Sequence, residues 1–425
     1  MSKRIYRSTS VNTLDLGKLV EAVRDRKITF AIDVAKRDMK AVVMEQPQVV
    51  LATLSWRAPE DTRRLVEVVS ALAEVSTVEV ALEPTGTYGD VVRALLGGLG
   101  LPIYRVSTKR SRDASEVYDG VPSQHDAKCA AIVGWLHGQG RSERWLEVSE
   151  ELRDLAAAVE LMVVFDKQEH ACANRLEAKL ARHFPELGEI LELGSATMLA
   201  LLETFGTAEE IAKSAPEARA LMMRVGGPLL APDKIERVIA AAKSTTGTKA
   251  SAGEKALLMG LAAETNRQRK QAAAARKTVE ELGSKHDGVR RVGEVLGKAS
   301  AAVLFVESGD PGLYKSAEAY TKSLGLNLKI KNSGKPADQG RLKITKRGAP
   351  RARFTLYMAV LRLIQHEVRF KAWYGRKVER DGGKMKLKAV VALMRKLAKA
   401  IWHVSRGTPF DSSRLFDDGR LGLAA

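Results

Sequence analysis

The sequence predicts a mixed α/β sheet with covering helices, followed by a helical middle region and a mostly helical C-terminal region. Three observations lead to this prediction. Residues 28–34 alternate their side chains with a period of two, as a strand with one buried face does. Strand and helix patterns then alternate as far as about residue 137. From Ser149 to about Gly283, strand patterns nearly vanish.

The N-terminal elements follow in chain order. A basic extension, residues 1–26, ends in a short amphipathic helix over 14–24. We expect strands over 28–34, 39–44, 49–56, 77–82 and 103–106, and helices over 60–75, 88–99 and 125–137. Pro59 precedes one of these helices and Gly100 follows another, where each residue type is favoured. The polar stretch 108–123 is predicted to be a loop.

Two long helices frame the middle region, residues 149–286. One runs from Leu152 to Leu180 and the other from Leu258 to Leu282, with apolar residues at alternating spacings of three and four. This spacing predicts coiled-coil helices, each with a polar break in its seam. Shorter helices and the linker 244–253 lie between them. The two seams can pair with each other or across the subunits of a dimer.

The last region, residues 287–425, is predicted to be helical and strongly basic. Helices are expected over 299–306, 351–368 and 384–404. Between residues 322 and 353, Asp338 is the only acid. The pair Gly297-Lys298 opens the first of these helices, and amide groups at such a position can bind a phosphate or simply cap the helix.

Composition narrows the function. The 425 residues carry 69 Lys and Arg against 51 acids, a formal charge of +18, so we expect a polyanionic partner, most simply nucleic acid. The two cysteines, Cys129 and Cys172, cannot build a disulfide framework, and no zinc-type Cys/His spacing occurs. Neither a signal peptide nor an apolar run of about 18 residues is present, which predicts a cytoplasmic protein without a membrane partner.

Three acids stand at element ends. Asp33 ends the first strand, Glu83 follows the fourth, and Asp126 begins the helix after the fifth. A ribonuclease-H-like sheet gathers acids around divalent ions from this order of elements. Carboxylates suit Mg²⁺, and two ions about 3.5–4 Å apart can activate one oxygen of a phosphodiester and stabilise the leaving oxygen. Taken singly, each acid also suits a turn, a strand end or a helix start; their joint placement favours a metal site.

Ser333 lies in a lysine-rich loop, between Asn332 and Gly334. A serine hydroxyl becomes a nucleophile when a base takes its proton or a metal lowers its pKa. Neighbouring lysines would hold a phosphate and stabilise the charge that develops during attack. From spacing alone, however, a Ser-Gly turn in a nucleic-acid-binding loop is the better interpretation.

Several motifs, in order, carry a resemblance to a known family. The N-terminal ones are AIDVAK, which contains Asp33, EPTGTY, which begins with Glu83, and HDAKCAAI, which contains Asp126. The C-terminal ones are GKASAAVLFVESGD, LGLNLKIKNSGK, ITKRGAPRARFTLYMAV and KMKLKAVVALMRKLAKAIWHV, with GTPFD near the end. Over roughly 27–140 and 290–411 the chain resembles the DEDD transposases of bacterial insertion sequences.

This resemblance implies a RuvC-like domain of the ribonuclease H fold over 27–148 and a transposase domain over 287–425. It implies a site-specific recombinase in which Asp33, Glu83 and Asp126 bind Mg²⁺ or Mn²⁺, and Ser333 bonds covalently to DNA. The implied partners are target DNA, donor DNA and a structured noncoding bridge RNA, with homodimers that assemble into tetramers. The expected location is the bacterial cytoplasm, on the nucleoid when DNA is bound.

Cys129 departs from the family pattern, because it stands where a fourth acid belongs, three residues after Asp126 on the same helix face. Cysteine prefers softer metals than Mg²⁺. Three explanations stay open. Three carboxylates suffice with water, or His125, Asp113 or Asp119 moves in, or the metal site is weakened.

Two other functions follow if parts of this resemblance do not hold. One is a metal-dependent nuclease or junction resolvase of the RuvC type, which hydrolyses DNA without a covalent link. The other is an RNA- and DNA-binding homologue with weakened catalysis.

Overall fold

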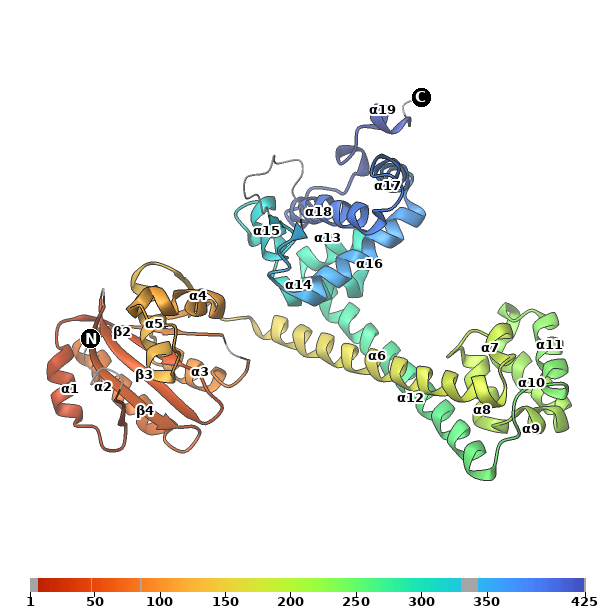
Figure 1. Cartoon of the computed structure of the whole chain (residues 1–425), viewed down its shortest axis with the longest axis horizontal. Coiled ribbons are helices and arrows are strands. Elements are labelled where there is room, and N and C mark those ends of the chain that lie inside the picture. The colour runs from red at the N-terminus through yellow and green to blue at the C-terminus, as the bar shows by residue number, and fades with distance from the viewer. Residues whose placement is uncertain (1–6, 47, 85, 330–342, 424–425) are drawn as a thin grey trace. The chain divides into compact units, whose positions relative to one another are not determined.

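The computed structural model describes residues 7–46, 48–84, 86–329 and 343–423, and its contacts divide the chain into two units, residues 1–147 and 148–425. The first unit contains the large sheet, and the second is almost entirely helical (Figure 1). None of the described helices is both long and apolar enough to cross a bilayer.

The first unit alternates strands and helices. Its elements are β1 (Thr9–Ser10), α1 (Leu16–Val23), β2 (Lys27–Asp33), β3 (Asp38–Glu45), β4 (Val49–Arg57), α2 (Thr62–Val75), β5 (Thr77–Leu82), α3 (Asp90–Gly98), β6 (Ile103–Val106), α4 (Thr108–Asp119), α5 (Asp126–Gly138) and β7 (Ser142–Arg144).

These strands form one seven-stranded mixed sheet in the order β1-β4-β3-β2-β5-β6-β7. Strands β2, β3 and β4 are an antiparallel meander, and β5 and β6 then add parallel to β2. This is the ribonuclease-H-like arrangement, so the predicted mixed sheet is confirmed. It places the C-terminal ends of the central strands β2 and β5 side by side.

Alternation along β2 sorts its side chains between the two faces of the sheet. Ile28, Phe30 and Ile32 are fully buried in a core that includes side chains of α1, α2 and α3. Ala31 faces the other way, into a second core with α4 and α5. Gly134 on α5 packs so close to Ala31 that an added Cβ would lie 3.1 Å from the Ala31 Cβ. Small residues therefore let α5 lie directly on the sheet.

The expected loop over 108–123 is wrong for most of its length, because residues Thr108–Asp119 form α4. The stretch is mostly polar and has only a narrow apolar face, which is why the helix was not predicted. Ala114 and Tyr118 on this face are buried, and the Tyr118 ring lies 5.7 Å from that of Trp135 on α5. Gly120, at a φ of 74°, ends the helix. The short edge strands β1 and β7 are also additions to the predicted fold.

The second unit begins with the long helix α6 (Glu150–His183), which packs against α12 (Ala252–Ser284). Both predicted helices are confirmed, and their seams meet within one chain. The buried residues of α6 are Leu155, Val159, Met162, Cys172, Leu176, Leu180 and His183. Those of α12 are Leu258, Ala262, Thr265, Gln268, Ala272, Ala275, Val279 and Gly283.

Five shorter helices between them form a compact group around one apolar core with the adjoining ends of α6 and α12. They are α7 (Leu187–Ile190), α8 (Ala196–Phe205), α9 (Ala208–Lys213), α10 (Ala215–Gly226) and α11 (Pro232–Lys243). The segment that follows α11 is bound to Glu186, which precedes α7. Thr245 and Thr246 each donate a hydroxyl hydrogen bond of 2.7 Å to the Glu186 carboxylate.

The remaining elements form another apolar core with the other ends of α6 and α12. They are α13 (Asp287–Leu296), α14 (Lys298–Ser308), α15 (Ala317–Ser323), β8 (Leu328–Lys329), β9 (Lys343–Ile344), α16 (Pro350–His366), α17 (Val368–Arg380), α18 (Lys386–Ser405) and α19 (Asp418–Leu421). The mostly helical C-terminal region is thus confirmed, with the predicted helix over 351–368 ending at His366.

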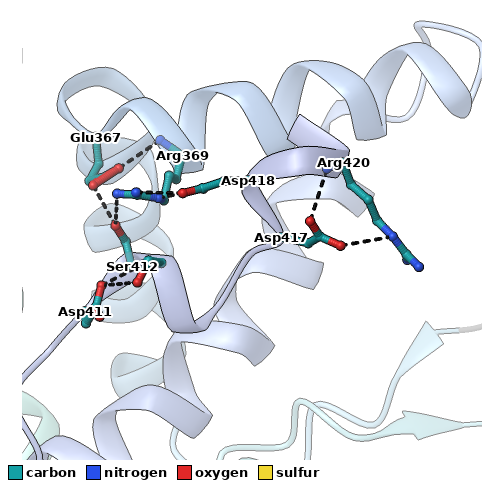
Figure 2. Close-up of polar contacts among 8 residues, drawn as sticks. Glu367, Arg369, Asp411, Ser412, Asp417, Asp418 and Arg420 are labelled. Atoms are coloured by element: carbon teal, nitrogen blue, oxygen red, sulfur yellow. Dashed lines mark hydrogen bonds and ion pairs between the residues drawn. The ribbon is translucent and has the colours of Figure 1, made fainter. Parts of the chain in front are cut away.

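A polar cluster fastens the C-terminal segment to the start of α17 (Figure 2). The guanidinium of Arg369 donates two hydrogen bonds of 2.8 Å to the carboxylate of Asp418. Ser412 donates a hydroxyl hydrogen bond of 2.8 Å to Glu367, which also caps α17 by accepting from the backbone amide of Arg369 at 2.9 Å. The Arg369–Asp418 pair and the Ser412–Glu367 hydrogen bond therefore hold the segment at two points.

Candidate active site

Strand register places Asp33 and Glu83 together. The last pair of the parallel β2–β5 ladder is Ile32 with Leu82, so Asp33 and Glu83 each stand one residue beyond it. Alternation turns both side chains to the face against which α5 packs. Glu83 is buried, at 8% exposure, while Asp33 is partly buried.

Helix α5 brings the third acid to the same edge. Near its C-terminal end, His137 Nε2 lies 3.0 Å from Glu79 Oε2 at the start of β5, and further back Gly134 contacts Ala31 on β2. The helix therefore runs opposite to these two strands. Its N-terminal residue, Asp126, reaches the edge where the strands end. The three predicted acids thus come from two strand ends and one helix start, as their order in the sequence implied.

The pKa of Asp33 depends on burial and on the two other acids. Burial, followed by the charges of Asp126 and Glu83, raises the pKa of Asp33 to about 7. Two like charges close together disfavour ionisation of each other, and a partly buried carboxyl loses hydration as well. Near neutral pH the cluster therefore holds a proton readily and attracts a cation.

Cys129 belongs to this cluster by position. Burial, followed by the charges of Asp33, Glu83 and Asp126, raises the pKa of its thiol to about 11. The thiol therefore keeps its proton at neutral pH, and a protonated thiol is a poor ligand for a hard cation.

Two of the groups considered as substitutes for the missing acid are held elsewhere. Asp113 lies 2.6 Å from Lys109 Nζ on the surface of α4. Asp119 lies 2.6 Å from the Nζ of Lys128, whose side chain is 1% exposed and also donates to the carbonyl of Val121. Removing Asp119 from this pair would leave a buried charge without its partner.

His125, the third group considered as a substitute, caps α5. Its Nδ1 accepts a hydrogen bond from the backbone amide of Lys128.

The donor set suits a divalent cation of the Mg²⁺ type. Asp33, Glu83 and Asp126 offer carboxylate oxygens, which are the preferred ligands of Mg²⁺ and Mn²⁺. Burial, followed by the negative charges of Asp126 and Glu83, raises the pKa of Asp33, and a cation would offset the part that comes from these charges. Within the described ranges, no three His, Cys, Asp or Glu side chains are grouped closely enough to hold an ion as they stand.

The predicted nucleophile, Ser333, lies outside the described residues. The glycine at the start of α14 is described: Gly297 has a φ of 85°. Beside it, Arg362 donates a 2.8 Å hydrogen bond to the carbonyl of Val295.

Sequence reasoning missed Lys40. The β2–β3 ladder pairs it directly with Asp33, so both side chains stand on the same face. The signal was present in the alternation of β3, because Val42 and Met44 lie on that face too.

Two family models match separate parts of the chain. Residues 30–185 match a model described as a transposase, of the DEDD type named for the insertion sequence IS110. Residues 294–375 match the model described as the transposase IS116/IS110/IS902 family. No curated protein matches the chain significantly. The two matched ranges contain the acid cluster and much of the C-terminal helical region, and together they cover more than half of the sequence. The chain therefore belongs to the IS110 family of DEDD transposases and is a DNA transposase of an insertion sequence.

Proposed function

We propose that this transposase cuts and rejoins DNA through a covalent phosphoserine intermediate, with Asp33, Glu83 and Asp126 as the acidic half of the active site and Ser333 as the nucleophile. One observation supports the proposal: Asp33 and Glu83 follow neighbouring strand ends and Asp126 begins the helix packed on them, with the pKa of Asp33 raised to about 7 by burial and by the charges of Asp126 and Glu83. Metal-dependent phosphoryl transfer needs such a concentration of oxygen ligands.

Each acid has a distinct setting. Glu83 is buried and follows a central strand, so its position is fixed by the sheet. Asp126 is exposed at the start of α5, where a substrate can reach it. Asp33, between them in burial, can exchange a proton near neutral pH and so assist deprotonation of an attacking hydroxyl. A bound divalent cation would supply Lewis acidity for the phosphate oxygens.

Ser333 would store the energy of the broken bond. Its Oγ bonds to phosphorus while one ester oxygen leaves and takes a proton, so one phosphodiester is exchanged for another. The reverse attack by a different DNA hydroxyl then joins new ends without an external energy source. Lysines close to Ser333 in the sequence, such as Lys331 and Lys335, would hold the phosphate during both steps.

RNA guidance and tetramer formation are parts of the same proposal, and the family resemblance supports them. The net charge of +18 agrees with a chain that binds two DNA molecules and a structured RNA. Dimers of dimers would let the acids of one subunit meet the serine of another.

A plasmid recombination assay tests the proposal and separates it from its alternatives. The DNA that flanks the gene supplies the candidate donor ends and noncoding segment. We expect joined products that require this segment, Asp126 and Ser333. Cleavage that persists in Ser333→Ala would indicate a RuvC-type nuclease instead. Binding of DNA and RNA without cleavage in Mg²⁺ or Mn²⁺ would indicate a weakened homologue.

A further inference from the structure

A row of polar side chains leads away from the acid cluster across one face of the sheet. The antiparallel ladders pair Asp33 with Lys40 and Lys40 with Ser55, and the parallel pair of β1 with β4 joins Ser55 to Ser10. Cross-strand partners stand on the same face, with Cβ atoms about 4.5–5.5 Å apart. The row therefore runs from the acids at the ends of β2 and β5 to the edge strand β1.

A hollow of about 200 Å³ lies along the outer part of this row, lined by Ser10, Lys40, Ser55 and Arg57 among others. Two acids, Asp38 and Asp61, also line it.

Both acids of the hollow have neighbours in the ladder or the loop. The carboxylate of Asp61 accepts hydrogen bonds from Asn12 Nδ2 at 2.8 Å and from the backbone amide of Arg57 at 3.0 Å. Asp38 is the direct cross-strand partner of Arg57.

Lys40 is the cation nearest to Asp33 in this row. Its side chain is partly buried, and its Nζ donates a 3.0 Å hydrogen bond to Ser8 Oγ. Among the described residues, no carboxylate lies within 4.0 Å of this ammonium group. A phosphate oxygen is a suitable acceptor for it, and the hydroxyls of Ser10 and Ser55 offer further donors.

We propose that this row is a track for the sugar-phosphate backbone of the DNA strand that is cut, with Lys40 holding a phosphate close to the scissile one. The inference rests on the proposed function, since it uses the acid cluster as the place of cleavage. Neighbouring strand backbones lie about 4.8 Å apart, so Lys40 stands one strand away from Asp33, on the same face of the sheet. The basic side chain thus fixes the register of the strand, and the serines line its path.

The first test measures DNA binding in EDTA, so that cleavage plays no part. The full-length protein binds a short fluorescein-labelled single strand, and anisotropy gives its Kd over a range of salt concentrations. Lys40→Met, which keeps the aliphatic stem, should weaken binding about 3–10-fold and lower the salt slope by about 0.7. Lys40→Arg should restore both. Lys18→Met, an exposed lysine on α1 at the other face, is the matched control and should change neither.

The second test maps the contact. An abasic aldehyde is placed in the DNA near the cleavage site, where a nearby lysine amine condenses with it to an imine and releases water. Borohydride then reduces the imine to a stable secondary amine. We expect the linked peptide to contain Lys40 and not Lys18. Equal DNA affinity of Lys40→Met and Lys18→Met, or DNA cross-links only to lysines other than Lys40, would contradict the proposal that this row binds the DNA backbone. An effect on a matched RNA strand but not on DNA would overturn it as well. Failure of the proposed function would give a different result: the wild-type protein would bind DNA through Lys40 but would not cleave it.

Discussion

His137 Nε2 lies 3.0 Å from Glu79 Oε2, at the opposite end of α5 from Asp126. The other ring nitrogen, Nδ1, lies 2.7 Å from Ser142 Oγ on β7, and Lys27 Nζ lies 3.2 Å from the same Glu79 oxygen. These bonds join the end of α5 to β2, β5 and β7. Because one rigid helix carries both ends, the histidine sets the position of Asp126 over the strands.

Replacing His137 by Ala should loosen α5. We expect the free energy of unfolding of the first unit to fall by about 1–3 kcal/mol, since a hydrogen bond to a charged group is lost and Glu79 is left partly buried. The affinity for Mg²⁺ should fall too, because Asp126 becomes less well placed. Calorimetry of unfolding and of Mg²⁺ binding measures both. His170→Ala, on an exposed face of α6, is the control. Unchanged Mg²⁺ affinity in His137→Ala would contradict the positioning role.

The raised pKa of Asp33 predicts a pH-dependent stability in metal-free protein. In the unfolded chain this carboxyl loses its proton near its ordinary value of 3.8, but the folded protein keeps it up to about pH 7. The folded state therefore binds the extra proton in this window, and stability falls as pH rises from about 4 to about 7. Asp33→Asn should remove this contribution.

We expect Asp33→Asn to raise the Tm in EDTA at about pH 8 by at least about 2 °C, and to have less effect at about pH 5. Added Mg²⁺ should raise the Tm of the wild type and not of Asp33→Asn. Glu74→Gln, an exposed acid on α2, serves as the control. A Tm in EDTA at about pH 8 that is lower in Asp33→Asn than in the wild type would contradict the electrostatic account.

Cys129 should be dispensable for catalysis. Its thiol has a pKa of about 11 and stays protonated, so Cys129→Ala should keep DNA cleavage within about threefold of wild type. Iodoacetamide at neutral pH should modify it slowly for the same reason. Cys129→Asp restores a fourth carboxylate and should tighten Mg²⁺ binding. If Ala abolishes cleavage and Asp raises it, three carboxylates are not enough.

The polar cluster in Figure 2 predicts which contacts hold the C-terminal segment. Arg369→Ala removes both hydrogen bonds to Asp418, so trypsin should cut after Arg414 at least about threefold faster, since local opening becomes more frequent. Arg420→Ala is the matched control, because the Arg420 side chain that pairs with Asp417 is 89% exposed. Equal cleavage of the two variants would show that the Arg369 pair does not hold the segment.

Sequence patterns predicted the parts of the fold that repeat a simple period. The seams of α6 and α12 were visible because each helix buries one face against an apolar surface. The alternation in β2 was visible because its larger apolar side chains lie on one face, but the prediction of a single buried face was wrong, since Thr29 and Ala31 on the other face are buried too. Helix α4 was missed since only Ala114 and Tyr118 give it an apolar face. Strands β1 and β7, of two and three residues, are too short to show a period. Only pairing defines them.

The candidate site was predictable in part for the same reason. Asp33, Glu83 and Asp126 could be placed at one edge because strand ends and helix starts are local features. For Lys40, the alternation of β3 gives only the face of the strand, since its nearness to Asp33 depends on the register of β2 against β3. The His137–Glu79 bond joins residues 58 positions apart, and nothing local marks it.

The central claim is that the acid cluster and Ser333 act on one phosphodiester, and trapping a covalent protein–DNA adduct tests it most directly. Wild-type protein with its flanking DNA, noncoding RNA and Mg²⁺ is denatured during the reaction, and the linked peptide is sequenced by mass spectrometry. The account predicts an adduct on Ser333 that disappears in both Ser333→Ala and Asp33→Ala. An adduct on another residue, or cleavage by Ser333→Ala at the wild-type rate, would contradict it.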